Sequence, residues 1–249
     1  MQIIDNVKII GLMLYLKKQR TLILSDIHLG YEEYMHKKGV VVPRFMLKDL
    51  ILRLESVFER VKPEKIIITG DLKHEFGEIN QQEWREILRF LDFLLKHCRE
   101  VIIIRGNHDR FLSPISRKRN IMLQSSVVID EYLIAHGDET FDIPENVKTI
   151  IIGHEHCAIS LKQKNRVERY KCFVSGKIMI KNKDKKQKYN LIAMPSSNTI
   201  TEGTDVLDEQ LLSPFLQHDL SDFSVFVVGG KNYDEMFEFG KVKELRKIV

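Results

Sequence analysis

The chain has 249 residues, a formal net charge of +4 and a sequence pI near 8.8. Hydrophobic residues make up 43% and charged residues 30%, which excludes a disordered or fibrous protein. No apolar run reaches the roughly 18–20 residues that a membrane helix requires, and the first ten residues lack the layout of a signal peptide. The three cysteines are widely spaced, so we expect a cytoplasmic protein without a disulfide framework or a zinc-finger pattern.

The first half of the chain alternates between expected strands and helices. Apolar runs of strand length cover 12–16, 21–25, 65–69 and 101–105. Apolar residues at helical spacing predict amphipathic helices over 44–60 and 83–97. Strands that alternate with helices imply crossover connections and a mostly parallel sheet.

From about residue 121 the pattern changes to short strands separated by turns. Residues 194–203 are expected to form a loop and 224–228 a strand, whereas 231–249 have no assignment. No internal repeat or linker divides the chain. We therefore expect a single domain over 1–249, in which two sheets pack in one core.

Polar residues that can bind metals follow five of the expected strands. They are Asp26 and His28, then Asp71, then Asn107 with His108 and Asp109, then His136, and finally His154 and His156. The carboxyl ends of strands in an open α/β sheet are where a ligand crevice lies. Alternation along an extended chain would put Asp26 and His28 on the same side, and likewise His154 and His156.

These residue types suit a centre with two metal ions. Carboxylate and imidazole ligands favour divalent manganese, iron, zinc or nickel, and no cysteine lies within the pattern. Seven candidate ligands exceed the needs of one ion, and two ions can activate a bridging water and hold a phosphate in line. Each motif alone is compatible with an ordinary turn or helix cap. Their occurrence together behind five apolar strands favours a functional site.

Five segments resemble, in order, the motifs of the calcineurin-like metallophosphoesterases: SDIHLG (25–30), GDLKHEFG (70–77), RGNHDR (105–110), AHGDE (135–139) and GHEHCA (153–158). The longer strings SDIHLGYEE, VVPRF and GDLKHEFG are most similar to an archaeal branch of predicted phosphoesterases. That branch is similar to the bacterial DNA-ligase-associated metallophosphoesterases. The resemblance implies an α/β fold, a four-layer α-β-β-α sandwich of two packed mixed sheets with helices outside. It also makes DNA-repair proteins expected partners.

The resemblance implies a role for each candidate residue. Asp26, His28 and His156 would bind the first metal, Asp71 would bridge, and Asn107, His136 and His154 would bind the second metal. Of the possible divalent ions, manganese is the first expectation. His108 would face the substrate phosphate and stabilise charge or protonate the leaving oxygen. Asp109 would orient His108 and fix its tautomer.

The sequence departs from the family pattern after Asp71. Lys73 and His74 stand where many relatives carry an acidic residue or an arginine, and a cation here could hold a substrate phosphate. The alternative for Lys73 is a surface ion pair with Glu75 or Glu78, and for Arg110 a salt bridge. Four residues are therefore second-tier candidates for substrate binding: Asn107, Lys73, His74 and Arg110.

A basic segment covers residues 162–188. It holds eleven Lys/Arg and two acids, a net charge of +9, which leaves −5 for the rest of the chain. Apolar and basic positions alternate imperfectly around Ser175–Lys177, which predicts a hairpin-like insertion. Its lysines and arginines would contact a nucleic-acid backbone, or would form a solvated strand edge.

The leading functional expectation is a dimetal phosphoesterase. We expect a phosphodiesterase or nuclease that acts on nucleic acid or nucleotides by attack of a metal-bridging hydroxide. Two alternatives remain open: a phosphomonoesterase or pyrophosphatase acting on a small molecule, and a non-catalytic scaffold that retains the fold.

Overall fold

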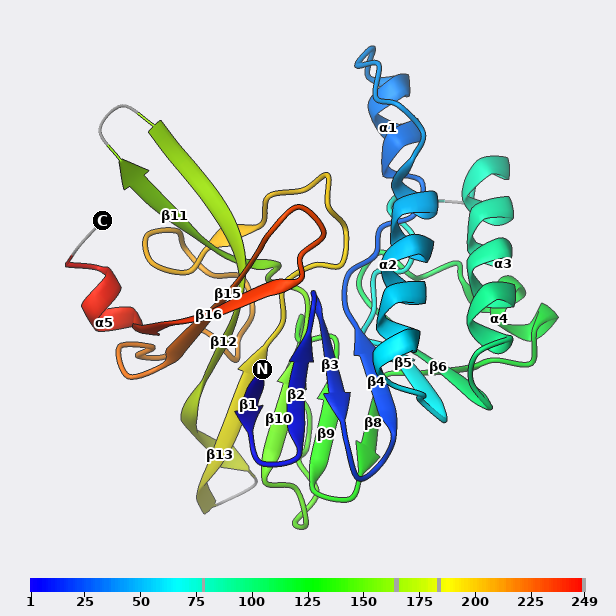
Figure 1. Cartoon of the computed structure of the whole chain (residues 1–249). Coiled ribbons are helices and arrows are strands. Elements are labelled where there is room, and N and C mark those ends of the chain that lie inside the picture. Colours follow the sequence, from blue (N-terminus) through cyan, green and yellow to red (C-terminus); the bar gives the residue numbers. More distant parts are fainter. Residues whose placement is uncertain (78, 164–165, 183–184, 248–249) are drawn as a thin grey trace.

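The structure is a computed structural model that describes residues 1–77, 79–163, 166–182 and 185–247. Two β-sheets pack face to face (Figure 1). The first sheet has the order β1 (Gln2–Ile4), β2 (Val7–Ile10), β3 (Met13–Leu16), β4 (Thr21–Leu24), β5 (Lys65–Ile68), β6 (Glu100–Ile104) and β7 (Met122–Gln124). Strands β1–β4 pair antiparallel, whereas β4–β7 pair parallel.

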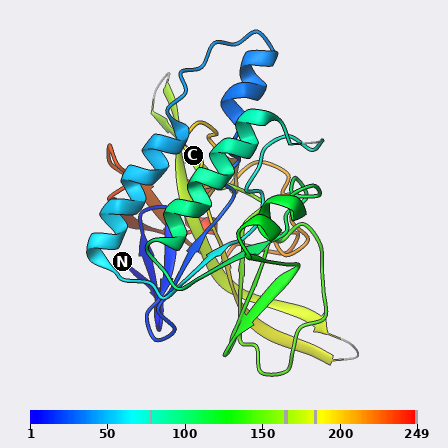
Figure 2. The same ribbon diagram turned by 90° about the vertical axis from the view of Figure 1, so that its right-hand side faces the viewer.

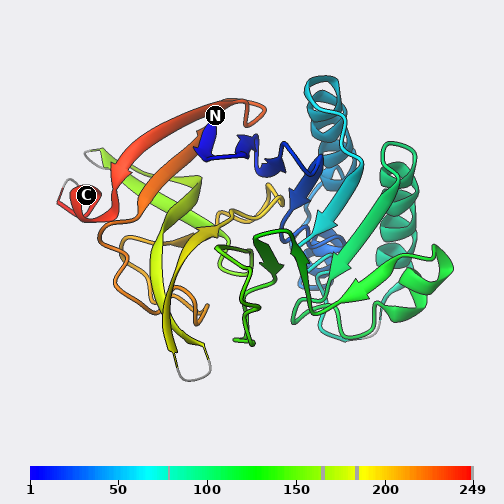
Figure 3. The same ribbon diagram turned by 90° about the horizontal axis from the view of Figure 1, so that it is seen from below.

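The second sheet is also mixed. Its order is β14 (Thr204–Asp205), β11 (Cys157–Gln163), β12 (Arg166–Asn182), β13 (Lys185–Ala193), β10 (Thr149–Ile152), β9 (Tyr132–Ala135) and β8 (Ser126–Ile129). β15 (Ser224–Gly229) pairs with β12 and with β16 (Glu235–Lys241). The hairpin of β15 and β16 lies beside the N-terminal strands (Figure 3), where the N-terminal amine contacts Met236 Sδ at 3.8 Å.

The helices cover the outer faces unequally. They are α1 (Tyr31–Lys37), α2 (Met46–Arg60), α3 (Gln81–Leu95), α4 (Ser113–Lys118) and α5 (Val242–Leu245). α2 and α3 lie side by side on the first sheet (Figure 2) and bury a common apolar cluster with it. None of the described helices is long and apolar enough to span a membrane, and all three cysteines are free thiols.

Irregular segments form most of the layer on the second sheet. Ile143, Leu211, Phe215 and Leu220 pack there, and α5 contributes Leu245. The expected α/β sandwich of two packed mixed sheets is confirmed. Its fourth layer contains little helix, since residues 206–223 form turns and loops and α5 has four residues.

The core between the sheets holds the two halves of the chain together. Ile9, Ile23 and Ile67 of the first sheet belong to one buried cluster with Ile151 and Phe173 of the second. Full burial of such a side chain contributes about 1.5–3 kcal/mol. Because the sheets are fixed to each other, the carboxyl ends of strands from both sheets meet at one end of the sandwich.

The sequence predicted the central elements well. The helices expected over 44–60 and 83–97 are α2 and α3, and the expected strands correspond to β3, β4, β5, β6 and β15. α3 begins earlier than predicted because Asn80 caps it, with Oδ1 accepting the N–H groups of Gln82 and Glu83 at 2.9 Å. The unassigned tail forms β16 and α5.

The prediction of one hairpin around Ser175–Lys177 is wrong. These residues lie inside β12, a strand of 17 residues, and Gly176 pairs with Leu191 of β13. The ring of Phe223 occupies the position that a Cβ at residue 176 would take. The glycine therefore permits a close contact between an aromatic ring and the strand and does not mark a turn.

The basic segment consequently divides between the two ends of β12. Lys162 and Arg166 lie where β11 meets β12, and Lys181, Lys185 and Lys186 lie where β12 meets β13. Residues 164–165 and 183–184 of the predicted segment lie outside the described residues. At about 3.3 Å per residue, the two ends of β12 are roughly 50 Å apart along the strand. Figures 1 and 2 place the first end near the level of α1 and the second at the opposite end of the molecule.

We predict that Gly176→Ala destabilises the protein by about 1–3 kcal/mol, because the new methyl group overlaps the Phe223 ring. Thermal unfolding measures the effect. Gly229→Ala in β15 is the matched control, since no heavy atom lies within 4 Å of its Cβ position. Phe223→Leu should recover part of the loss in the double variant. Equal melting temperatures for the two alanine variants would contradict the assignment.

Candidate metal centre

The candidate ligands stand on sharp turns directly after their strands. Five of them have left-handed backbones, with φ of 46° at Asp26, 52° at His28, 48° at Asp71, 65° at His154 and 52° at His156. Such φ values are uncommon for residues other than glycine and cluster at functional sites. The extended alternation predicted for Asp26-x-His28 and His154-x-His156 is therefore wrong. The side chains of each pair converge because the backbone turns at both residues.

Hydrogen bonds between the turns hold these backbones in place. The His154 N–H donates to both carboxylate oxygens of Asp26 at 3.1 Å, and the His28 N–H donates to the Asp71 carbonyl at 2.8 Å. Gly153 lies so close to Asp26 and Ser25 that a Cβ would overlap both side chains. The ends of β4, β5 and β10 thus lock one another together.

Among the described residues, three groups of three side chains could hold a metal ion. One is His28 with His74 and His108, and the other two contain six of the seven predicted ligands. The ligand atoms of Asp26, His28 and His156 lie within 4.8 Å of one another, and those of Asp71, His136 and His154 form a second such group. Asn107 Oδ1 joins the second group, 3.0 Å from His136 Nε2.

Asp71 lies between the two groups. Its Oδ2 is 3.4 Å from His136 Nε2 in the second group and 3.8 Å from His28 Nε2 in the first. The carboxylate is only 3% exposed. The structure therefore brings together all seven residues that the sequence singled out as ligands and puts the expected bridging residue in the middle.

The donor geometry fits divalent ions. His28 Nε2 and His156 Nε2 are 3.1 Å apart, and so are His136 Nε2 and His154 Nδ1. Nitrogen ligands about 2.1 Å from one ion and 90–110° apart are separated by about 3.0–3.4 Å. Converging imidazole lone pairs repel one another unless a proton or a cation lies between them. These residues would hold two borderline divalent cations.

The electrostatics favour the charge states that metal binding needs at His28 and Asp26, whereas His136 holds a proton that a bound cation would have to displace. Burial and the nearby charge of His156 hold the pKa of His28 well below its usual value, so this imidazole is neutral. Burial alone would raise the pKa of Asp26, but His156, His136 and Ser25 lower it to about 2. Burial would lower the pKa of His136, whereas Asp71 and Asp26 raise it to about 10. The two buried carboxylates thus require compensating positive charge.

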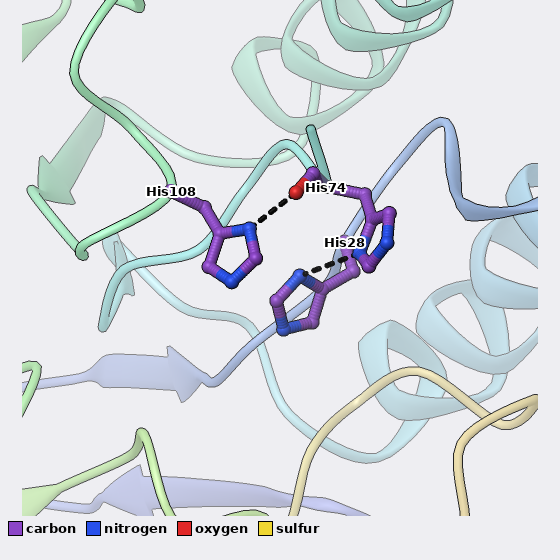
Figure 4. Close-up of side chains that lie close together, drawn as sticks. All are labelled: His28, His74 and His108. Carbon is purple, nitrogen blue, oxygen red and sulfur yellow. Dashed lines mark hydrogen bonds between the residues drawn. The ribbon is translucent and has the colours of Figure 1, made fainter. Parts of the chain in front are cut away.

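His108 stands at the edge of the centre. Its N–H donates to Asp71 Oδ1 at 3.0 Å, and its Nε2 lies 3.9 Å from Asp71 Oδ2. Its Nδ1 hydrogen-bonds the backbone carbonyl of His74 (Figure 4). A carbonyl only accepts, so His108 carries a proton on Nδ1 and presents Nε2 to the centre.

The predicted pairing of Asp109 with His108 is wrong. Asp109 is fully buried, and its carboxylate accepts N–H groups from Leu72 at 3.1 Å, Lys73 at 3.3 Å and Gly106 at 3.1 Å. Burial and the charge of Asp71 raise the pKa of Asp109 to about 7. Asp109 fixes the loops after β5 and β6, and the His74 carbonyl orients His108 in its place.

The second-tier residues lie in different surroundings. His74 Nδ1 is 3.4 Å from His28 Nδ1 (Figure 4), so His74 contacts a candidate ligand on the side away from the centre. Lys73 is fully buried, and its Nζ donates to the Gly77 carbonyl at 3.1 Å, while Glu75 pairs with Lys37. Glu78 lies outside the described residues.

Arg110 is exposed and forms no salt bridge within the described part of the chain. Its predicted part in substrate binding stays a prediction.

Phe76 is a residue that the sequence analysis missed. Its ring stacks on the His108 ring with centroids 3.7 Å apart and an interplanar angle of 28°, yet the residue is 60% exposed. A single phenylalanine in a loop carries no periodic signal, so only its position in the fold reveals it.

The chain belongs to the calcineurin-like phosphoesterase family, whose model matches residues 19–219. This match contains all the candidate ligands. It also supports a hydrolase that acts on phosphoesters and uses a dinuclear metal centre.

Two further proteins are similar to this chain. The crystal structure of Pseudomonas putida nuclease MPE superposes with a TM-score of 0.63 and 16% identity, covering 94% of each chain, which shows a common fold. The DNA polymerase II small subunit of Methanocaldococcus jannaschii is 38% identical over 98 residues. That match covers 34% of this chain and 16% of the subunit, so this chain spans only a small part of that relative.

We predict that Asp71→Asn lowers the amount of bound divalent metal, because the two ligand groups lose the anion between them. Elemental analysis after dialysis against manganese should give about one ion or fewer per chain, against about two for the unchanged protein. Asp5→Asn, at an exposed residue of the turn between β1 and β2, is the matched control. Unaltered stoichiometry in Asp71→Asn would show that Asp71 does not bridge.

Proposed function

We propose that this protein is a dimetal phosphodiesterase that acts on nucleic acid or nucleotides. The observation that carries the proposal is the position of the Asp71 carboxylate between two groups of metal ligands, with His108 at its edge. Two divalent ions held there, manganese first among them, would supply Lewis acidity and an activated water for attack on phosphorus.

His108 has the geometry of a catalytic residue that touches the substrate. Its Nδ1 donates to the His74 carbonyl, so Nε2 is the ring nitrogen available to a substrate. Nε2 points to the side where Asp71 lies and can stabilise charge on phosphate oxygens or give a proton to the leaving oxygen. The backbone bond from His108 to Asp71 fixes this position relative to the metal ligands.

The exposed ring of Phe76 supports an aromatic substrate. It covers one face of His108 and offers its other face to solvent. A nucleobase that stacks on such a ring gains about 1–3 kcal/mol, and stacking tolerates any base. A nucleotide unit next to the scissile phosphate would find this surface, which favours a phosphodiester of nucleic acid over a small phosphomonoester. The fold shared with a nuclease agrees with this choice.

The test of the proposed function is a substrate panel with manganese. It contains bis-p-nitrophenyl phosphate, p-nitrophenyl phosphate, pyrophosphate, single- and double-stranded DNA, and RNA. We expect diester and nucleic-acid cleavage to exceed monoester cleavage, and chelation to abolish both. Preference for the monoester or for pyrophosphate would contradict the proposal. Full metal binding without any hydrolysis would favour a scaffold.

We predict that His108→Ala lowers kcat by roughly 10²–10⁴ and leaves the metal content unchanged, because His108 acts on substrate and is not a metal ligand. Turnover of bis-p-nitrophenyl phosphate and elemental analysis measure the two quantities. His218→Ala, at an exposed histidine far along the chain, is the matched control. Loss of metal together with activity would show that His108 is a ligand.

Nucleic acid would reach the centre along the β11–β12 end of the basic segment. β11 begins directly after His156, and Figures 1 and 2 place its far end on the same side of the molecule as α1. Lys162 and Arg166 are exposed there, whereas Lys181 and Lys186 stand at the opposite end of β12. We therefore propose the first pair, and not the second, as phosphate contacts.

We predict that Lys162→Glu/Arg166→Glu weakens binding of single-stranded DNA and flattens its salt dependence. Each lost phosphate contact reduces the slope of log K against log salt by about 0.7. Lys181→Glu/Lys186→Glu carries the same charge change at the other end of β12 and should leave the slope unchanged. Fluorescence anisotropy at several salt concentrations makes the comparison. Equal slopes for the two double variants would reject the proposed path.

A further inference from the structure

Two adjoining cavities are lined by residues of α2, the turn from β15 to β16, and the loop of residues 197–201. The larger has a volume of about 620 Å³ and is lined by Arg53, and the smaller has about 260 Å³ and is lined by Lys171. Thr199, Lys231 and Tyr233 line both. The shared wall makes them one site, here named the paired cavities, of a size that accepts a small organic molecule.

The paired cavities contain buried hydrogen-bond donors without partners among the described residues. Lys171 is 5% exposed, and its Nζ has no hydrogen-bond partner among the described residues. The same holds for Arg53 Nε and Thr201 Oγ1, which also line the paired cavities. Buried polar groups normally have partners, and a buried donor left without one costs about 1–3 kcal/mol.

Neither Arg53 nor Lys171 forms an ion pair within the described chain, although Asp49 and Asp26 act on them at longer range. Asp49, Asp234 and Glu202 line the paired cavities, but the described residues show no ion pair between them and Arg53 or Lys171. Burial and the charge of Arg53 lower the pKa of Lys171 to about 7, which the charge of Asp26 only partly opposes. An anion between the two cations would remove this conflict.

We propose that the paired cavities bind a phosphate-bearing organic molecule, with its phosphate between Arg53 and Lys171. Guanidinium, ammonium and hydroxyl donors from α2, β12 and the 197–201 loop line the two adjoining cavities, and such donors suit a tetrahedral oxyanion. Leu12, Met13 and the Tyr233 ring line the larger cavity and offer an apolar surface to the rest of the molecule.

The paired cavities are linked to the metal centre through one loop. Arg53 Nη2 donates to the Ser197 carbonyl at 3.2 Å, and the Ser197 N–H donates to the Ser25 carbonyl at 2.7 Å, next to Asp26. The phosphate group has two possible sources, a free nucleotide and a strand of nucleic acid that extends from the metal centre. Both present the same chemistry to Arg53 and Lys171.

Thermal shift of the manganese-loaded protein at pH 6 tests the site. The additives are inorganic phosphate, a nucleoside monophosphate and short single-stranded DNA, each against sodium chloride of equal ionic strength. We expect the nucleoside monophosphate to raise Tm by at least about 3 °C. Lys171→Met and Arg53→Met should lose most of this rise, whereas Lys177→Met, at an exposed position of β12, should keep it.

The Asp71→Asn background separates the paired cavities from the metal centre. The increase in Tm caused by the nucleoside monophosphate should persist in Asp71→Asn. Failure of the paired-cavity proposal is therefore distinguishable from failure of the proposed phosphodiesterase activity. A rise with DNA alone would assign the phosphate to a strand, and a rise with the mononucleotide would assign it to a free nucleotide. Full retention of the rise in both Lys171→Met and Arg53→Met, or no rise with any phosphate compound, would overturn the proposal.

The unliganded protein gives a second readout. Because the pKa of Lys171 lies below its ordinary value of 10.5, the unfolded chain binds more protons than the folded chain between about pH 7 and 10.5. The contribution of Lys171 to the free energy of unfolding therefore increases as the pH rises across that window. Lys171→Met should raise Tm most at pH 6 and progressively less toward pH 10. A Tm gain that does not depend on pH would mean that Lys171 carries no uncompensated charge.

Discussion

The need to neutralise two buried carboxylates organises this molecule. Asp26 and Asp71 have almost no solvent exposure, and an isolated buried carboxylate is too costly for a marginally stable protein. Imidazoles surround both of them, and one of these, His136, is held protonated by their charge. Two divalent cations would replace that proton and satisfy the remaining lone pairs. The strained turns at the strand ends bring these candidate ligands close together.

The sandwich provides the rigidity that such strain requires. The five candidate ligands with left-handed backbones can keep this strained conformation only where packing and hydrogen bonds from neighbouring segments hold it in place. The core between the sheets fixes the ends of β4, β5, β6, β9 and β10, and hydrogen bonds between the turns complete the frame. Asp109 belongs to this frame, since it joins the loop after β5 to the loop after β6.

Much of the fold and of the candidate centre could be predicted because both depend on local patterns. Apolar runs predicted the central strands, helical spacing predicted α2 and α3, and the polar residues behind the strands predicted all seven candidate ligands that the structure brings together. The contacts of Asp109, Phe76 and Lys171 could not be predicted, because they join segments distant in sequence. The hairpin at Gly176 was wrongly predicted for the same reason: the residue that requires glycine there is Phe223, on another element. Backbone turns at Asp26 and His28 likewise depend on neighbours across the sheets.

The central claim is that two metal ions share Asp71. Crystals grown with manganese, with anomalous diffraction data collected near its absorption edge, test it most directly. We predict two anomalous peaks about 3.5–4 Å apart, both next to the Asp71 carboxylate, with Asp26, His28 and His156 around one and Asn107, His136 and His154 around the other. A single peak, or a second peak away from Asp71, would contradict it.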